Sequence, residues 1–107
     1  MAEPYLTDLR DLIDRQALPD KIICKHFFSG AAAYAGERIF MSLTPAGLAL
    51  KLSPDHLEEA FANGAMPLKY FPKAPVKKDY ALLPRHIVED EKVLRSWLVC
   101  SLGFVGI

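Results

Sequence analysis

Residues 64–85 hold the side chains with the clearest capacity for binding chemistry. Several cations and aromatic rings are accompanied there by a single carboxylate, that of Asp79; the candidate contacts are Lys69, Lys73, Lys77, Lys78, Arg85 and Tyr70. Cationic side chains neutralise phosphates and aromatic rings stack on bases, so this composition favours a nucleic-acid contact. Lysines at a hairpin tip also discourage pairing between sheet edges, so a solvated tip without a ligand is the competing interpretation.

The remaining polar residues do not form a catalytic or metal-binding pattern. His26, His56 and His86 are not spaced as in an HExxH helix, and a metal site would need all three to converge. Cys24 and His26, two positions apart on an expected strand, share a face without necessarily touching. The chain also has no G-x-S-x-G elbow, P-loop or GxGxxG loop. We therefore expect no enzyme activity, no cofactor and no metal ion.

The charge balance argues against strong nucleic-acid affinity of the molecule as a whole. The 107 residues include 13 Lys plus Arg and 13 Asp plus Glu, so the formal net charge is zero. The charges are unevenly spread, however, because residues 1–20 are mainly acidic and residues 69–85 mainly basic. The basic part suits a polyanion or an acidic protein surface.

The cysteines and the lengths of the apolar segments indicate the cellular compartment of the protein. Cys24 and Cys100 are too few for a disulfide scaffold and fit no metal-ligand spacing, so we interpret them as buried thiols in a reducing compartment. Their separation in sequence does not forbid a bridge between them. The acidic N-terminus lacks the apolar run of a signal peptide, and no segment has the roughly 20 apolar residues that span a bilayer. We expect a cytoplasmic protein without a membrane contact.

Periodicity and turn residues predict which elements position these side chains. We expect a helix, three strands, a helix, two strands and a last helix, at residues 4–18, 21–34, 38–43, 48–52, 54–63, 67–71, 80–83 and 90–102. Ser29-Gly30 interrupts the first strand as a bulge or kink would. Ser53-Pro54 begins the second helix and Asn63-Gly64 ends it with a left-handed cap. The two short strands at residues 67–83 form a hairpin with the basic tip between them.

These elements predict the fold class. The turns are too short for parallel crossovers, so we expect one domain, residues 1–107, of the α+β class. It would be a two-layer sandwich, with an antiparallel sheet of about five strands and helices on one face. The last helix, the most apolar, would pack across the sheet. The core would hold Leu48, Leu50 and Leu52 of a half-buried strand and the aromatic residues Phe27, Phe40, Phe61 and Trp97.

The C-terminal residues are apolar but interrupted by Gly103 and Gly106. This pattern predicts a frayed tail or an exposed apolar patch. With the hairpin edge, such a patch would contact a protein partner or a second copy of the chain. The candidate contacts are Leu102, Phe104 and Val105.

Several strings, in their order along the chain, resemble the N-terminal domain of the TfoX/Sxy competence regulators of bacteria. The similar strings are Phe27-Phe28-Ser29-Gly30-Ala31, Gly36-Glu37-Arg38-Ile39-Phe40, Leu48-Ala49-Leu50-Lys51, Gly64 to Tyr70, Tyr80 to Pro84, and Trp97. Phe27 and Ser29 stand where the family pattern has Met and Gly. The resemblance covers residues 5–102, nearly the whole chain.

The resemblance implies a two-layer α/β sandwich and a role in transcriptional regulation. Full-length competence regulators carry a second, C-terminal helical domain, so this chain looks like a stand-alone N-terminal domain. We expect a non-enzymatic regulatory or binding module that acts through protein–protein contacts. The alternative is a DNA-binding protein that uses the basic hairpin of residues 69–85.

Overall fold

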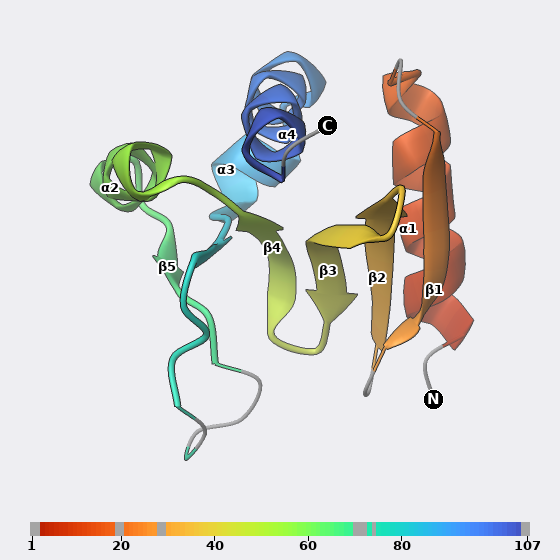
Figure 1. The fold of residues 1–107 in the computed structure, drawn as a ribbon, viewed down its shortest axis with the longest axis horizontal. Helices are drawn as coiled ribbons and strands as arrows, with labels where there is room; N and C mark the ends of the chain where they lie inside the picture. The colour runs from red at the N-terminus through yellow and green to blue at the C-terminus, as the bar shows by residue number, and fades with distance from the viewer. Residues whose placement is uncertain (1–2, 19–20, 28–29, 70–72, 74, 106–107) are drawn as a thin grey trace.

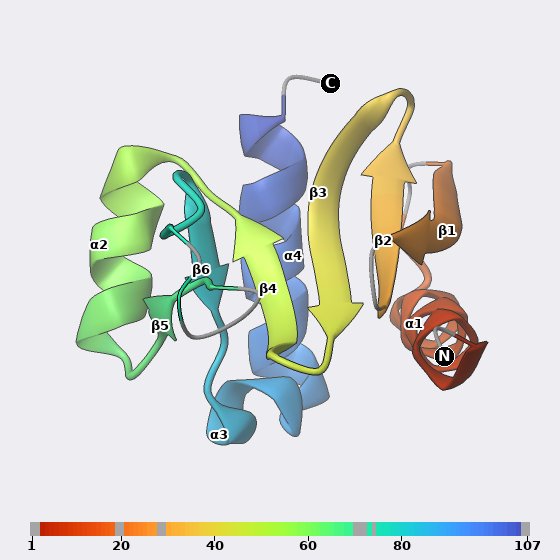
Figure 2. The same ribbon diagram turned by 90° about the horizontal axis from the view of Figure 1, so that it is seen from below.

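A computed structural model describes residues 3–18, 21–27, 30–69, 73 and 75–105 of the chain. The elements are α1 (Glu3–Gln16), β1 (Ile22–Phe27), β2 (Gly30–Ala35), β3 (Arg38–Thr44), β4 (Gly47–Lys51), α2 (Pro54–Ala62), β5 (Met66–Pro67), β6 (Tyr80–Leu82), α3 (Arg85–Val88) and α4 (Glu91–Phe104). The strands form one antiparallel sheet in the order β1-β2-β3-β4-β6-β5 (Figure 1 and Figure 2). The α+β class and the antiparallel sheet are confirmed.

The sheet has six strands rather than about five, because the expected first strand is two strands. Phe27 is the register partner of Gly30, so the chain reverses direction there, where the sequence predicted only a bulge or kink. The irregularity lies instead between β2 and β3, where the register shifts at Ala33 and Tyr34. The prediction was wrong because a strand followed by a tight reversal and another strand has the same apolar composition as one interrupted strand.

The main core lies between the sheet and the two long helices. α1 packs against β1, β2 and β3, whereas α4 packs against β3 and β4, as Figure 2 shows from below the sheet. Leu9 of α1, Leu50 of β4 and Leu98 of α4 are fully buried in one cluster, so both helices cover the same face. The expected packing of the last helix across the sheet is confirmed.

Two interactions fix α4 against its surroundings. The Ser101 hydroxyl is buried and lies 3.1 Å from the carbonyl oxygen of Phe40 and 2.6 Å from that of Lys51, so one side chain links α4 to two strands. At the other end of α4, the buried Gln16 side chain donates a hydrogen bond to the Glu91 carbonyl, at 3.1 Å. The end of α1 is thereby joined to the start of α4.

Strand β4 is buried on both faces, although the sequence predicted a half-buried strand. Leu48, Leu50 and Leu52 are buried as expected, but Ala49 is buried too. Ala49 belongs to a second, smaller cluster with Leu68 and Tyr80, which the β5–β6 hairpin supplies. The hairpin therefore covers part of the face that the helices leave open.

The predicted boundaries of α2 and the predicted start of α4 are confirmed in their chemistry, whereas α1 ends at Gln16 instead of residue 18 and α4 continues to Phe104. The Ser53 hydroxyl accepts a hydrogen bond from the His56 backbone N–H, and Asp90 caps α4 by accepting from two backbone N–H groups. Gly64 has a φ of 101°, which glycine adopts without steric cost. The Ala65 N–H donates to Ala60 and the Gly64 N–H to Phe61, the paired bonds of a Schellman cap.

The aromatic core prediction is confirmed for two of its four residues. Phe40 and Trp97 are buried, but Phe27 is only half-buried and Phe61 is 41 % exposed. α2 presents Ala60 to the interior, and the next residue along a helix is rotated by about 100°. Phe61 therefore points away from the sheet.

Candidate functional site

The predicted basic hairpin is present, and its lysines are exposed. Lys69, Lys73, Lys77 and Lys78 lie in the connection between β5 and β6, which projects from one end of the molecule (Figure 1). The connection is held at its base, where the Lys77 N–H donates to the Leu68 carbonyl at 2.8 Å. Tyr70 lies outside the described residues.

The structure does not bring Arg85 to these lysines. Arg85 begins α3, which lies far from the tip of the hairpin (Figure 1). Its Nε lies 2.9 Å from a carboxylate oxygen of Glu89, one helical turn further on. Arg85 is thus paired with Glu89, the residue that follows α3, and its place beside the lysines in the sequence does not make it part of the same surface.

The predicted C-terminal patch is not exposed as expected. Leu102 and Val105 belong to the main core, so the predicted exposure of these two residues is wrong. The Arg38 guanidinium donates a 2.8 Å hydrogen bond to the Val105 carbonyl and holds the end of α4 against the sheet. Phe104 is half-buried. α4 continues through Phe104 despite Gly103. Because the helix does not end at this glycine, its last apolar side chains are held against the core.

Two of the three histidines and the second cysteine line a groove between α2, α3 and α4, whereas His26 lies on β1. His56, His86, Trp97 and Cys100 contribute to the groove, and its volume is about 610 Å³. Burial raises the pKa of the Cys100 thiol, and the nearby Glu59 carboxylate raises it further. Cys100 is therefore mainly protonated at neutral pH, and a thiol is a poorer nucleophile than a thiolate. Among the described residues, no three His, Cys, Asp or Glu side chains gather as metal ligands.

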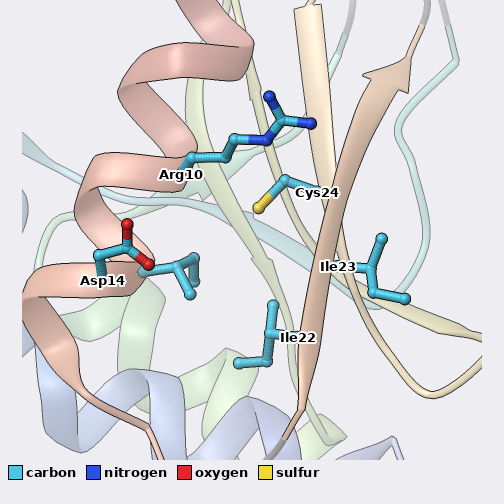
Figure 3. Close-up of a pocket in the computed structure, with 6 residues that line it drawn as sticks. Arg10, Asp14, Ile22, Ile23 and Cys24 are labelled. Carbon is cyan, nitrogen blue, oxygen red and sulfur yellow. The ribbon is translucent and has the colours of Figure 1, made fainter.

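A second groove runs along the outer edge of the sheet, between α1 and β1. Figure 3 shows Arg10 and Asp14 on the helix side and Ile22, Ile23 and Cys24 on the strand. Its volume is about 330 Å³. β1 is the terminal strand of the sheet, and among the described strands it pairs only with β2. The groove therefore lies beside backbone groups that another strand can pair with.

The side chains of this groove differ in exposure and charge. Arg10 and Asp14 are exposed at its rim, Ile13 and Ile22 are half-buried, and Cys24 is buried. Burial raises the pKa of the Cys24 thiol; Arg10 opposes this effect and Asp14 adds to it. Both charged side chains thus affect the pKa of Cys24, which lies at the floor of the groove as an uncharged thiol at neutral pH.

Lys25, in the middle of β1, does not lie along the open edge. Its ammonium group is 5.4 Å from the centroid of the Tyr34 ring, on the neighbouring strand β2. A cation above an aromatic ring is attracted by the ring's negative face. The exposed Lys25 side chain therefore extends over β2, away from the outer edge of β1.

Comparison with known proteins assigns the family. The model of the TfoX N-terminal domain matches residues 15–105. The chain belongs to the TfoX N-terminal domain family. No curated protein matches the chain. The family match includes all six strands of this TfoX N-terminal domain but begins at the last turn of α1, so Arg10, Ile13 and Asp14 precede it.

Sequence reasoning missed the edge groove of this TfoX N-terminal domain. Ile23 is 44 % exposed on β1, yet the sequence placed Ile22 and Ile23 together in one apolar strand. The two consecutive isoleucines could have indicated the groove. Consecutive residues of a strand point to opposite faces, so only one of the two can face the helix.

The described part of the chain contains no helix of the length and hydropathy needed to cross a membrane.

Proposed function

We propose that this TfoX N-terminal domain is a non-enzymatic binding module that acts through protein–protein contacts, with the outer edge of β1 as its contact. The observation that carries the proposal is the position of β1 at the end of the sheet, with a groove beside its residues Ile22, Ile23 and Cys24. An exposed edge offers a row of backbone donors and acceptors. A partner supplies an extended segment that adds to the sheet, and the groove receives side chains of that segment.

The residues along this edge favour such a contact. Ile23 exposes 44 % of its surface at the edge, which adds apolar contact to the backbone hydrogen bonds. Lys25, the residue type that usually protects an edge from pairing, lies over Tyr34 instead. A cytoplasmic location and a regulatory role are proposed from family membership alone.

Site-specific photo-crosslinking in living cells that express the protein tests this function. A photo-activated amino acid at position 23 is expected to form an adduct with one identifiable protein, mapped by mass spectrometry to a single segment of that protein. The same amino acid at position 99 is the control, because Val99 is an equally apolar residue, 53 % exposed on α4. Equal adducts at both positions, or none at position 23, would contradict a contact at the β1 edge.

DNA binding through the β5–β6 connection is the second candidate function. The observation that favours it is the exposure of all four of its lysines, Lys69, Lys73, Lys77 and Lys78. If they neutralise four phosphates, affinity for a random duplex should fall on the order of a hundredfold between about 50 and about 200 mM salt. Fluorescence anisotropy of a labelled duplex measures this dependence.

Charge reversal in the hairpin separates a specific contact from general attraction. Lys73→Glu with Lys78→Glu is expected to abolish the DNA binding. Lys21→Glu with Lys92→Glu makes the same change of net charge at exposed positions outside the hairpin and should leave most of the affinity. No binding by the unchanged protein at low salt, or equal losses in the two variants, would exclude the hairpin as a DNA site.

A further inference from the structure

We infer that the β1 edge binds a second copy of this chain, with β1 antiparallel to β1 of the partner across a two-fold axis. The inference rests on the proposed function and names its partner. A two-fold interface uses the same surface on both subunits, so that surface must be complementary to itself. The edge groove meets this requirement in its charges, its apolar floor and its geometry.

The charges at the rim of the groove are self-complementary. Arg10 and Asp14 are four residues apart, so they lie on the same side of α1, and both line the groove (Figure 3). A two-fold axis between them sets the two α1 helices antiparallel, so that Arg10 of each copy is opposite Asp14 of the other. In the described part of the chain, neither residue takes part in an ion pair within its own subunit.

The position of α1 leaves room for this arrangement. α1 packs over β1 and β2, so its axis is set back from the sheet edge. Neighbouring strands are about 4.8 Å apart, so the two helices would be between two and three strand spacings apart, roughly 10–14 Å. Closely packed helices are about 8–10 Å apart, so backbones would not collide, and an arginine side chain spans the remaining gap.

The floor of the groove gains burial from the same pairing. Ile13 and Ile22 are half-buried in the single subunit, and Ile23 is 44 % exposed on the other face of β1. Pairing at the edge would cover apolar surface on both faces of the strand. The two sheets would join into one continuous sheet whose α1 helices lie side by side on one face.

The opposite edge of the sheet is poorly suited to the same contact. β5 has two residues, Met66 and Pro67, and proline has no N–H to donate to a neighbouring strand. The two edges therefore differ, and pairing of copies at β1 closes after two subunits instead of continuing into a fibre.

Charge reversal with mixing tests the inference. In sedimentation-velocity measurements, the unchanged chain is expected to be a dimer. Arg10→Asp and Asp14→Arg should each place two like-charged pairs in the interface and weaken dimerisation by about tenfold or more. An equimolar mixture of these two variants should form a heterodimer, because each then carries the charge that the other requires.

The control and the contrary outcomes are specific to this interface. Asp8→Arg makes the same charge change as Asp14→Arg about 120° away around α1, outside the groove, and it should leave the dimer intact. Circular dichroism checks that every variant is folded. A monomer at the highest soluble concentration overturns the inference. So does a dimer that both reversals leave unchanged, or a mixture that does not associate. A monomer that still crosslinks from position 23 to a different protein overturns the second copy as partner and leaves the proposed function standing.

Discussion

Gly30→Ala is expected to destabilise the domain by at least about 3 kcal/mol, beyond the usual range for an added methyl group in a packed core. A Cβ at position 30 would lie 2.1 Å from the carbonyl oxygen of Leu43 and 2.7 Å from the Cα of Thr44. Both are backbone atoms of β3, so no side-chain rotation relieves the overlap and the strands must separate. Urea unfolding followed by tryptophan fluorescence measures the change in free energy.

Gly103→Ala is the matched control for this prediction. It adds the same methyl group within α4, where nothing lies within 4 Å of the new Cβ. Alanine is favoured over glycine in a helix by up to about 1 kcal/mol, so stability should be unchanged or slightly raised. If Gly30→Ala unfolds at the same urea concentration as the unchanged protein, β2 and β3 are not as close as the structure places them.

Phe40→Ala is expected to cost about 3–5 kcal/mol of unfolding free energy, because it removes a fully buried aromatic side chain from the centre of the main core. A small domain has a total stability of about 5–15 kcal/mol, so this single change removes a large share. The midpoint of urea unfolding should fall accordingly. The loss would affect both long helices, since α1 and α4 contribute to the same cluster.

Phe61→Ala supplies the comparison, because it deletes the same atoms at a position that is 41 % exposed on α2. We expect it to cost under about 1 kcal/mol, since a large part of this ring remains in water in the folded protein. Equal losses at the two positions would mean that α2 packs more deeply than the structure shows.

Local signals were sufficient to predict much of the fold. The start of α2 at Ser53-Pro54, its end at Gly64 and the cap of α4 at Asp90 all follow from backbone hydrogen-bonding needs that one or two residues satisfy. The α+β class followed from the length of the turns. Features that depend on contacts between distant segments were predicted less well. The reversal at Phe27 and Gly30 was taken for a bulge, and the burial of Ala49 depends on a hairpin about 20 residues away.

The candidate site was harder to predict for the same reason. Whether a strand lies at an edge depends on the order of all strands in the sheet. No residue of β1 by itself indicates that this strand is at an edge. Proximity in the sequence predicts that Arg85 belongs to the basic cluster, yet β6 leads the chain away from the lysines before α3 begins at Arg85. The glycines that follow Leu102 and Val105 predict an exposed tail, whereas α4 and its C-cap residue Val105 place both side chains in the core.

The dependence of the core on α4 has a consequence for synthesis of the protein. Leu94 and Leu98 complete a cluster that begins with Leu6 and Leu9, and Ser101 joins β3 to β4. A nascent chain on the ribosome lacks these partners until residues 91–104 have emerged from the exit tunnel. Until then the apolar face of the sheet is uncovered, and such surfaces are where incomplete chains aggregate. Apolar surface of this domain is therefore exposed for longer during synthesis than in a domain whose core is closed by its N-terminal half.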